Sequence, residues 1–409
     1  MKNNVGLESI SFQETILFKE LALTFKDLKE VKVAEIPDHE AVSRLSKVVE
    51  HHTGLNVFFD FTENYDPHVD VPNLDRNNPL IIDMYREFVK STDGLSMINK
   101  AGNAIHGTID LKNSKVSGVF TEIKVTVYMG ASYISGIRFN ENELAAIVLH
   151  ELGHMFTYFE FITRTVTTNQ VLAGLSKAMD GVETQDKKMI ALTSAKKALK
   201  LEELDLKDIS ELDKDAISIV YISSSVEKSR SELGYNIYDL TSWEYLSDQF
   251  CARHGAYASL VSALEKIYKG QYNLAFRSTG GYLFVEVLKL VLMPFSPVLV
   301  ILLIVIDSAN GGTYDLPIAR FKRVRDQAVQ YLKDTNITKE NRARVLMDIA
   351  AIDSILKGMS ERKQLATIIH EFCSKRTRDE RTYRKLQQDL EHIAMNDLFV
   401  KSAQLSQLS

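Results

Sequence analysis

The spacing of hydrophobic and polar residues predicts a mixed but mainly helical N-terminal region. Apolar side chains recur at helical intervals through "FQETILFKELALTFKDL" (12–28) and again through "AVSRLSKVVEHH" (41–52). The run "LNVFFDF" (55–61) has the short apolar and aromatic composition that is typical of a strand. We therefore expect residues 1 to about 100 to form a mixed α/β region.

A small sheet followed by a helix is predicted next along the chain. The segment 62–79, "TENYDPHVDVPNLDRNNP", is rich in Asp, Asn and Pro and is predicted to be a loop. Segments 104–111 and 119–130 gather β-branched and aromatic residues between turn signals, which indicates strands. In "NENE", Asn140 can cap a helix while Glu143 reaches back to complete a capping box, so a helix should start near residue 141.

The second half of the chain shows helical patterns with many charges. Residues from about 170 to 230 are amphipathic and charged, which most simply indicates solvated helices. After about residue 318 the pattern is almost wholly helical, with Glu, Lys and Arg interleaved and no proline. We expect an α+β, predominantly helical protein with a central domain over 101–330 and a charged helical C-terminal region over 331–409.

One segment, 283–306, is unusually apolar. As a continuous helix it would be roughly 36 Å long at 1.5 Å per residue, enough to cross a bilayer. However, Pro294 and Pro297 interrupt it, and Glu286 and Lys289 stand in its first half. Two interpretations stay open: a buried core helix or broken hydrophobic hairpin, and contact with a membrane.

Composition and charge restrict the class of protein. The 409 residues are 45% hydrophobic and 25% charged, with a net charge of -5, so a nucleic-acid partner is not expected. The two cysteines, Cys251 and Cys373, form no Cys-x-x-Cys pair, which fits a reducing compartment. The N-terminus has no continuous apolar stretch typical of a cleaved signal peptide. We expect a cytoplasmic or membrane-associated protein, and the sequence does not indicate its oligomeric state.

The most informative motif is His-Glu-x-x-His, formed by His150, Glu151 and His154 in the run "ELAAIVLHELGHMFTYFEF". Residues four apart on a helix project from the same face, so the two imidazoles can bind one metal ion. Glu151 stands beside the first ligand, where its carboxylate can reach a water without itself ligating the metal. The motif therefore predicts half of a zinc site and a neighbouring base.

The missing ligand is predicted downstream. A third histidine in the pattern His-x-x-Gly-x-x-His is excluded, because Thr157 and Glu160 occupy the positions that the glycine and the histidine would need. In "TSWEYLSDQFCARHG", Glu244 and Asp248 are four apart and share one helix face. Glu244 is the candidate third ligand, and Asp248 can accept a hydrogen bond from the far nitrogen of a ligand histidine. The alternative is an exposed acidic pair on a surface helix.

The combination of His-Glu-x-x-His with Glu-x-x-x-Asp resembles the signature of the gluzincin metallopeptidases. The letters "EYLSD" match the second motif of thermolysin-like enzymes, but here 90 positions separate His154 from Glu244, which is a longer gap. That gap is similar to the one in the family of the CAAX prenyl protease and the HtpX heat-shock protease. The segment "VTVYMGASYISGIRFNENELAAIVLHELGH" is similar to that family's edge strand, glycine turn and active helix.

A further element of the resemblance is "TYDLPIARF", which is similar to the family's "THPxxxxRI". Thr313 and Arg320 keep its seven-residue separation, but Tyr314 and Asp315 stand where the family has His-Pro. The resemblance covers roughly residues 100 to 330 and is strongest at the two zinc motifs. It implies a zincin-like catalytic domain with a small β-sheet and Zn²⁺ as cofactor.

The resemblance also implies roles for individual residues. Glu151 would be the general base, and Tyr314 and Arg320 would stabilise the oxyanion. The strand in 124–131 would be a sheet edge that pairs with an extended polypeptide substrate.

Other donors and other functions stay open. Tyr235 and Tyr238, just upstream of the glutamate helix, are competing oxyanion donors. The predicted function is a zinc-dependent endopeptidase. One alternative is a structural or assembly protein built on a peptidase-like scaffold. Another is a membrane-acting protein whose hydrophobic segment, 283–306, carries its main function. Retention of Glu151 favours the enzyme, because a structural zinc site has no use for a general base.

Overall fold

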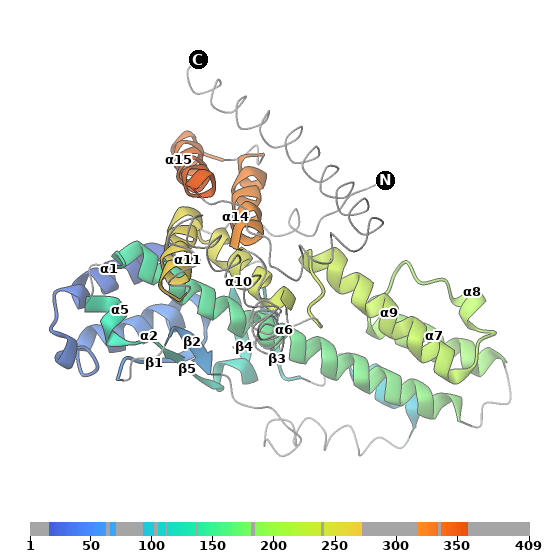
Figure 1. Ribbon diagram of the computed structural model, residues 1–409. Coiled ribbons are helices and arrows are strands. Elements are labelled where there is room, and N and C mark those ends of the chain that lie inside the picture. Colours follow the sequence, from blue (N-terminus) through green and yellow to red (C-terminus); the bar gives the residue numbers. More distant parts are fainter. Residues whose placement is uncertain are drawn as a thin grey trace, which may run out of the picture. The chain divides into compact units, whose positions relative to one another are not determined.

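The structure is a computed structural model (Figure 1). It describes these residues: 16–62, 66–70, 93–101, 105–111, 113–135, 138–180, 185–238, 241–271, 317–333 and 337–358. The chain divides into two compact units, one of residues 1–137 and 148–250 and one of residues 138–147 and 251–409. The limits of these units fall within two helices, α6 (Glu141–Met179) and α10 (Thr241–Arg253).

The first unit begins with two packed helices, α1 (Ile16–Lys29) and α2 (Glu40–Thr53), joined through the short 3-10 helix η2 (Val33–Glu35). Both helices lie in segments whose spacing predicts a helix, so this prediction is confirmed over the described residues. Their apolar stripes are fully buried at positions such as Leu21, Phe25 and Leu45.

A three-stranded mixed sheet follows, with the order β1-β5-β2. Strand β1 (Asn56–Asp60), predicted from its composition, pairs in parallel with β5 (Lys124–Tyr128). Strand β2 (His68–Asp70) pairs antiparallel with the other side of β5. The side chains of Val57, Val125 and Val127 are buried.

The sheet order corrects two expectations. Strand β5 is the central strand, so the prediction that it is a sheet edge able to pair with a substrate is wrong: β1 and β2 already occupy both of its sides. Part of the predicted loop 62–79 is strand β2. Its three residues are too few for the alternation of side chains to be recognised among Asp, Asn and Pro.

The remaining strands form a separate hairpin of β3 (Gly107–Asp110) and β4 (Lys115–Gly118). The 3-10 helix η3 (Val119–Thr121) then leads into β5, and α5 (Ala131–Ser135) follows β5. In η3, Phe120 is buried and its ring lies 4.7 Å from that of Phe159 on α6. This contact packs the segment before β5 against α6.

The helix that carries His-Glu-x-x-His, α6, is the longest element described, at 39 residues. Its start is the predicted capping box: the Asn140 amide donates to Glu143 Oε2 at 2.8 Å, and the Glu143 amide donates to Asn140 Oδ1 at 2.9 Å. Two unsatisfied donors at the helix start are thereby paired. The prediction of a helix beginning near residue 141 is confirmed.

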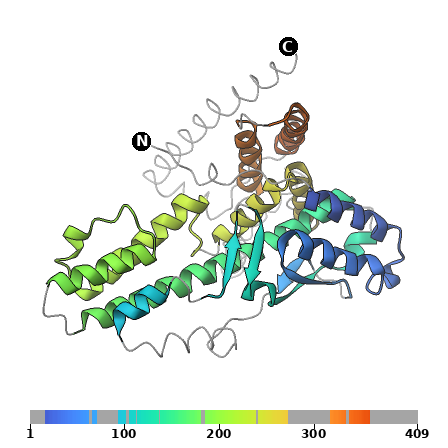
Figure 2. The ribbon, with the colours of Figure 1, turned by 180° about the vertical axis from the view of Figure 1, so that it is seen from behind.

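The distal part of α6 belongs to a helical layer with α4 (Gly94–Ala101), α7 (Gln185–Ala198), α8 (Leu206–Ile209) and α9 (Lys214–Leu233), as Figures 1 and 2 show. The charged segment from about 170 to 230 is helical as expected, and one face of it is buried in a shared core. In that core the Tyr221 hydroxyl donates to the Leu192 carbonyl at 2.7 Å. Fully buried members of this core are Ile98, Val171, Leu175, Leu192 and Ile217.

The second unit contains the first residues of α6 and three packed helices, α11 (Tyr257–Gln271), α14 (Pro317–Leu332) and α15 (Lys339–Gly358). Phe321 and Val324 of α14 and Ile349 of α15 are buried. These helices confirm the helical pattern after residue 318 as far as the chain is described. The rest of 331–409 lies outside the described residues.

The overall class agrees with the prediction, since the described chain is mostly helical with a small mixed sheet. The predicted limit at residue 100 falls inside α4, and the one at 330 falls inside α14. The apolar segment 283–306 lies outside the described residues. Among the helices that are described, none combines the length and the apolar character needed to cross a membrane.

Candidate metal centre

His150 and His154 meet on one face of α6, one helical turn apart. Their rings are edge to face, with centroids 4.7 Å apart, and their Nε2 atoms are 3.1 Å apart. His150 is buried and His154 is half-buried. The spacing of the motif therefore brings two imidazole nitrogens together, as the sequence predicts.

Helix α10 is held very close to α6 at this point. A Cβ added to Gly153 would lie 2.7 Å from the Cα of Ser247 and 3.0 Å from its carbonyl oxygen, so only glycine fits there. Next to this contact the rings of Phe156 and Phe250 stack with centroids 4.9 Å apart. Close backbone packing at Gly153 thus fixes the position of Glu244, one turn before Ser247.

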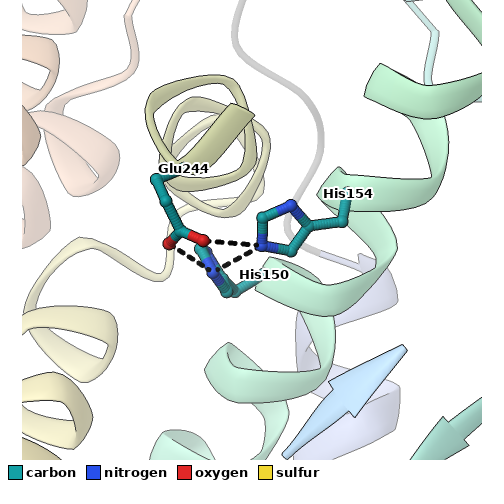
Figure 3. Close-up of side chains that lie close together, drawn as sticks. All are labelled: His150, His154 and Glu244. Atoms are coloured by element: carbon teal, nitrogen blue, oxygen red, sulfur yellow. Dashed lines mark hydrogen bonds and ion pairs between the residues drawn. The ribbon is translucent and has the colours of Figure 1, made fainter. Parts of the chain in front are cut away.

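Glu244 faces both histidines. Its Oε2 lies 3.4 Å from His150 Nε2, and its Oε1 lies 3.4 Å from His154 Nε2 (Figure 3). The three residues each offer a ligand atom, and these atoms all lie within 4.8 Å of one another. The group His150, His154 and Glu244 could therefore hold a metal ion.

Zinc binds nitrogen and oxygen at about 2.0–2.2 Å, and the edge of a tetrahedron with such bonds is about 3.4 Å. The two imidazole nitrogens are 3.1 Å apart, and each lies 3.4 Å from a different oxygen of Glu244. With one ligand atom from each residue, the atoms lie within 4.8 Å of one another, so the group could hold a metal ion.

Asp248 lies behind His150. Its Oδ1 is 3.1 Å from His150 Nδ1, and both side chains are buried. Because a carboxylate accepts, His150 Nδ1 carries the hydrogen, and the lone pair of the neutral ring is on Nε2, the atom that faces Glu244. This is the tautomer that a metal ligand requires, and it agrees with the position predicted for Asp248.

Glu151 is buried beside the ligand group, with 7% of its surface exposed. Burial raises the pKa of its carboxyl above the ordinary value of 4.5, and His150 and His154 act in the opposite direction. A carboxyl in this environment holds a proton more readily than one in water. The direction of this shift is the one that suits a residue that accepts a proton.

Of the two predicted oxyanion donors, only Arg320 is among the described residues. Tyr314 lies outside the described residues. Arg320 is buried on α14 in the second unit, where its guanidinium donates to the Tyr268 hydroxyl at 3.1 Å. A catalytic role for either residue stays a prediction.

The competing tyrosines lie in an apolar cluster with Leu233, Ile237 and Leu246. Tyr238 lies edge to face with Phe161, and burial raises the pKa of its hydroxyl. The Tyr235 ring lies 5.1 Å from that of Tyr245. Their described contacts are those of core aromatics.

One further residue that acts on Glu151, His68 on β2, is not predicted by the sequence. Its effect lowers the pKa of Glu151 and is smaller than the effects of burial, His150, His154 and Glu244. Nothing local in "DPHVDVP" distinguishes this histidine from a loop residue, because its position depends on the pairing of β2 with β5.

Comparisons with known proteins do not identify the chain: no protein-family model, no curated protein and no solved structure matches it. The account of its function therefore rests on the geometry and chemistry of the His150, His154 and Glu244 group.

Proposed function

We propose that the protein is a zinc-dependent endopeptidase of the gluzincin type. The observation that carries this proposal is the arrangement of His150, His154 and Glu244, which brings two imidazole nitrogens and a carboxylate together in a group that could hold a metal ion. The sequence motifs "HELGH" and "EYLSD" support the same class. Glu151 is not one of the three proposed ligands, so its carboxylate can act as a base. A purely structural metal site would not need such a residue.

The donor set favours zinc over other biological cations. Two imidazoles and one carboxylate suit zinc, whereas Ca²⁺ and Mg²⁺ prefer sites built wholly from oxygen ligands. Three protein ligands are also the number found in catalytic zinc sites, which keep one position for water or substrate. When bound, zinc would supply a water of lowered pKa and a Lewis acid for the substrate carbonyl.

The chain's own residues then account for the movement of the proton. Glu151 takes a proton from the attacking water as the water oxygen bonds to the carbonyl carbon of the peptide. The C–N bond breaks, and Glu151 returns the proton to the leaving nitrogen, which departs as an amine. Asp248 keeps His150 in the tautomer that presents Nε2.

The substrate proposed is a polypeptide in an extended conformation. Strand β5 is paired on both sides, so a substrate strand would have to add to an outer strand of the sheet, β1 or β2.

The test is metal analysis combined with a cleavage assay on fluorescein-labelled casein, with wild type, Glu151→Gln and Glu122→Gln. Glu122 is an exposed glutamate outside the site and serves as the matched control. We expect about one zinc per chain in all three proteins, and cleavage reduced by about 10²–10⁴-fold in Glu151→Gln alone.

Two results would reject the proposal. One is cleavage by Glu151→Gln at the wild-type rate. The other is a wild type that binds no zinc. A protein that binds zinc and cleaves nothing would instead favour the structural or assembly alternative.

A further inference from the structure

An aromatic patch stands beside the proposed metal ligands. It consists of Tyr158 and Phe161 on α6 and Trp243 on α10. Tyr158 follows His154 by four residues, so the two side chains project from the same face of α6. Trp243 is the residue immediately before Glu244. On each of the two helices, the patch therefore begins within one turn of a proposed ligand.

The rings of the patch contact one another between the two helices. The centroid of the Trp243 ring lies 6.1 Å from that of Tyr158, with 61° between the planes, and 5.4 Å from that of Phe161, with 59° between the planes. Inclined pairs of this kind are favourable for aromatic rings. Trp243 Nε1 also donates to the Ile237 carbonyl oxygen at 2.8 Å. These contacts hold the patch in one arrangement.

The patch rests on packed apolar residues but is not itself buried. Phe161 packs against the core cluster of Leu233, Ile237 and Leu246. The side chains of Tyr158, Phe161 and Trp243 are all half-buried, so each keeps part of an apolar ring in contact with water. Covering such surface with a further apolar group is favourable. The patch is therefore suited to bind an apolar group close to the metal centre.

The length of the patch indicates which group can reach it. Phe161 follows His154 by seven residues, which is about 10 Å of helix. An extended polypeptide advances about 3.3 Å per residue, so a side chain within about three residues of the scissile bond spans that distance. One further turn along α6, Arg164 donates to Glu160 and Glu232, each at 2.7 Å, so charged side chains follow the patch.

We propose that the aromatic patch selects an aromatic side chain of the substrate, so that the protein prefers phenylalanine, tyrosine or tryptophan at one position within three residues of the bond it cleaves. This inference rests on the proposed peptidase function. A leucine would also cover apolar surface, but only a ring adds inclined aromatic contacts with Tyr158 and Trp243. The patch selects the substrate and takes no part in the movement of the proton.

The first test is to locate the bonds that wild type cleaves in a library of random decapeptides, by mass spectrometry of the products. Aromatic residues should be enriched at one position within three residues of those bonds. A cleaved peptide is then made with phenylalanine, leucine or alanine at that position. The value of kcat/KM should be about 3–10-fold higher with phenylalanine than with leucine, and about 10–100-fold higher than with alanine.

Substitutions assign the preference to the patch. Tyr158→Leu keeps an apolar side chain and removes the ring, so the ratio of kcat/KM for phenylalanine over leucine should fall toward one. Tyr158→Phe keeps the ring and should keep the ratio. Ile219→Ala, which changes an exposed apolar residue on α9, is the control. Loss of folded or zinc-loaded protein cancels in this ratio, and Phe161→Leu gives the same comparison if Tyr158→Leu does not fold.

A second measurement does not depend on cleavage. Trp243 is the only tryptophan of the chain, so tryptophan emission reports on the patch alone. Zinc-loaded Glu151→Gln is titrated with the phenylalanine peptide and with the alanine peptide. The phenylalanine peptide should shift the emission and protect Trp243 from quenching by acrylamide, and the alanine peptide should need a concentration at least about 10-fold higher for the same effect.

Three results overturn the inference and leave the peptidase function standing. They are cleaved bonds without aromatic enrichment, a phenylalanine-to-leucine ratio in Tyr158→Leu equal to that of wild type, and a Trp243 emission that responds equally to the two peptides. A zinc-loaded wild type that cleaves no peptide of the library would overturn the peptidase function itself, and the aromatic preference with it.

Discussion

Two glutamates, Glu143 and Glu244, show two ways in which this chain places a carboxylate inside the protein. Glu143, in the second unit, is 2% exposed and accepts hydrogen bonds from Asn140 N, from Ser262 Oγ at 2.5 Å and from Lys266 Nζ at 2.7 Å. Glu244, in the first unit, faces the imidazoles of His150 and His154 at 3.4 Å.

The difference lies in the charge that each partner brings. The Lys266 ammonium lies 2.7 Å from Glu143, so the chain itself supplies a charge opposite to that carboxylate. Glu244 faces two imidazoles, and His150 also contacts Asp248 through Nδ1. The Glu143 pair stabilises the fold, whereas the carboxylate of Glu244 and the two imidazoles could together hold a cation.

Glu244→Ala should have the largest effect on metal binding. Removing a ligand should weaken zinc affinity by more than about 100-fold, which exceeds the usual cost of losing an outer hydrogen-bond partner. Glu143→Gln is the comparison, because it alters a buried glutamate that is not a ligand. The measurement is competition with a zinc chelator. Equal affinities of Glu244→Ala and wild type would remove Glu244 from the ligand set.

Glu143→Gln should have the largest effect on stability. It removes the charge that balances Lys266 and weakens the capping box of α6, so the free energy of unfolding should fall by about 2–3 kcal/mol. That figure allows for the partial exposure of the Lys266 side chain, which is 35%. Urea unfolding measures it, and Glu143→Gln combined with Lys266→Met should recover part of the loss. A variant as stable as wild type would show that this network contributes little.

Asp248→Asn should weaken zinc binding less than Glu244→Ala does. An amide can present its nitrogen to His150 Nδ1 and disfavour the required tautomer, and loss of such a partner typically costs about 10–100-fold in metal affinity. The same chelator competition measures it. If Asp248→Asn were as damaging as Glu244→Ala, Asp248 would have to be considered a ligand itself.

Asp348 on α15 is a third carboxylate inside the protein, and its replacement has the smallest expected effect. Burial raises the pKa of its carboxyl from 3.8 to about 6, and Arg344 only partly opposes this. Since the folded pKa is the higher one, the folded state binds more protons between pH 4 and 6, and stability is lost as pH rises through that range. Asp348→Asn should therefore raise the free energy of unfolding at pH 7 by about 1–2 kcal/mol and change it little at pH 4. Urea unfolding at the two pH values checks this, and an equal effect at both would contradict it.

Much of the metal group could be predicted from the sequence, because its geometry is local to two helices. The i, i+4 spacing places His150 with His154 and Glu244 with Asp248, whatever the rest of the chain does. The capping box is also local, because Asn140 and Glu143 lie within four consecutive positions. The contact between helices α6 and α10 is predicted only because a zinc site with two histidines needs a third ligand. Its physical basis is the close approach of Gly153 and Ser247, which neither motif reveals.

The parts that depend on distant pairing were not predictable. The central position of β5 follows from its bonds to β1 and β2, which lie 56 or more residues earlier in the chain. The partner of Glu143, Lys266, follows it by 123 residues and has no pattern that links the two. Sequence periodicity shows which face of a helix or strand is buried, but it does not show which other element packs against that face.

The most direct test of the central claim is zinc K-edge X-ray absorption on the purified protein. The account predicts a four-coordinate zinc with only nitrogen and oxygen neighbours at about 2.0–2.1 Å and the multiple scattering of two imidazoles, in wild type and in Glu143→Gln alike. In Glu244→Ala this spectrum should change or the bound zinc should be lost. A sulfur neighbour at about 2.3 Å, a spectrum with no imidazole, or an unaltered spectrum in Glu244→Ala would contradict a centre built from His150, His154 and Glu244.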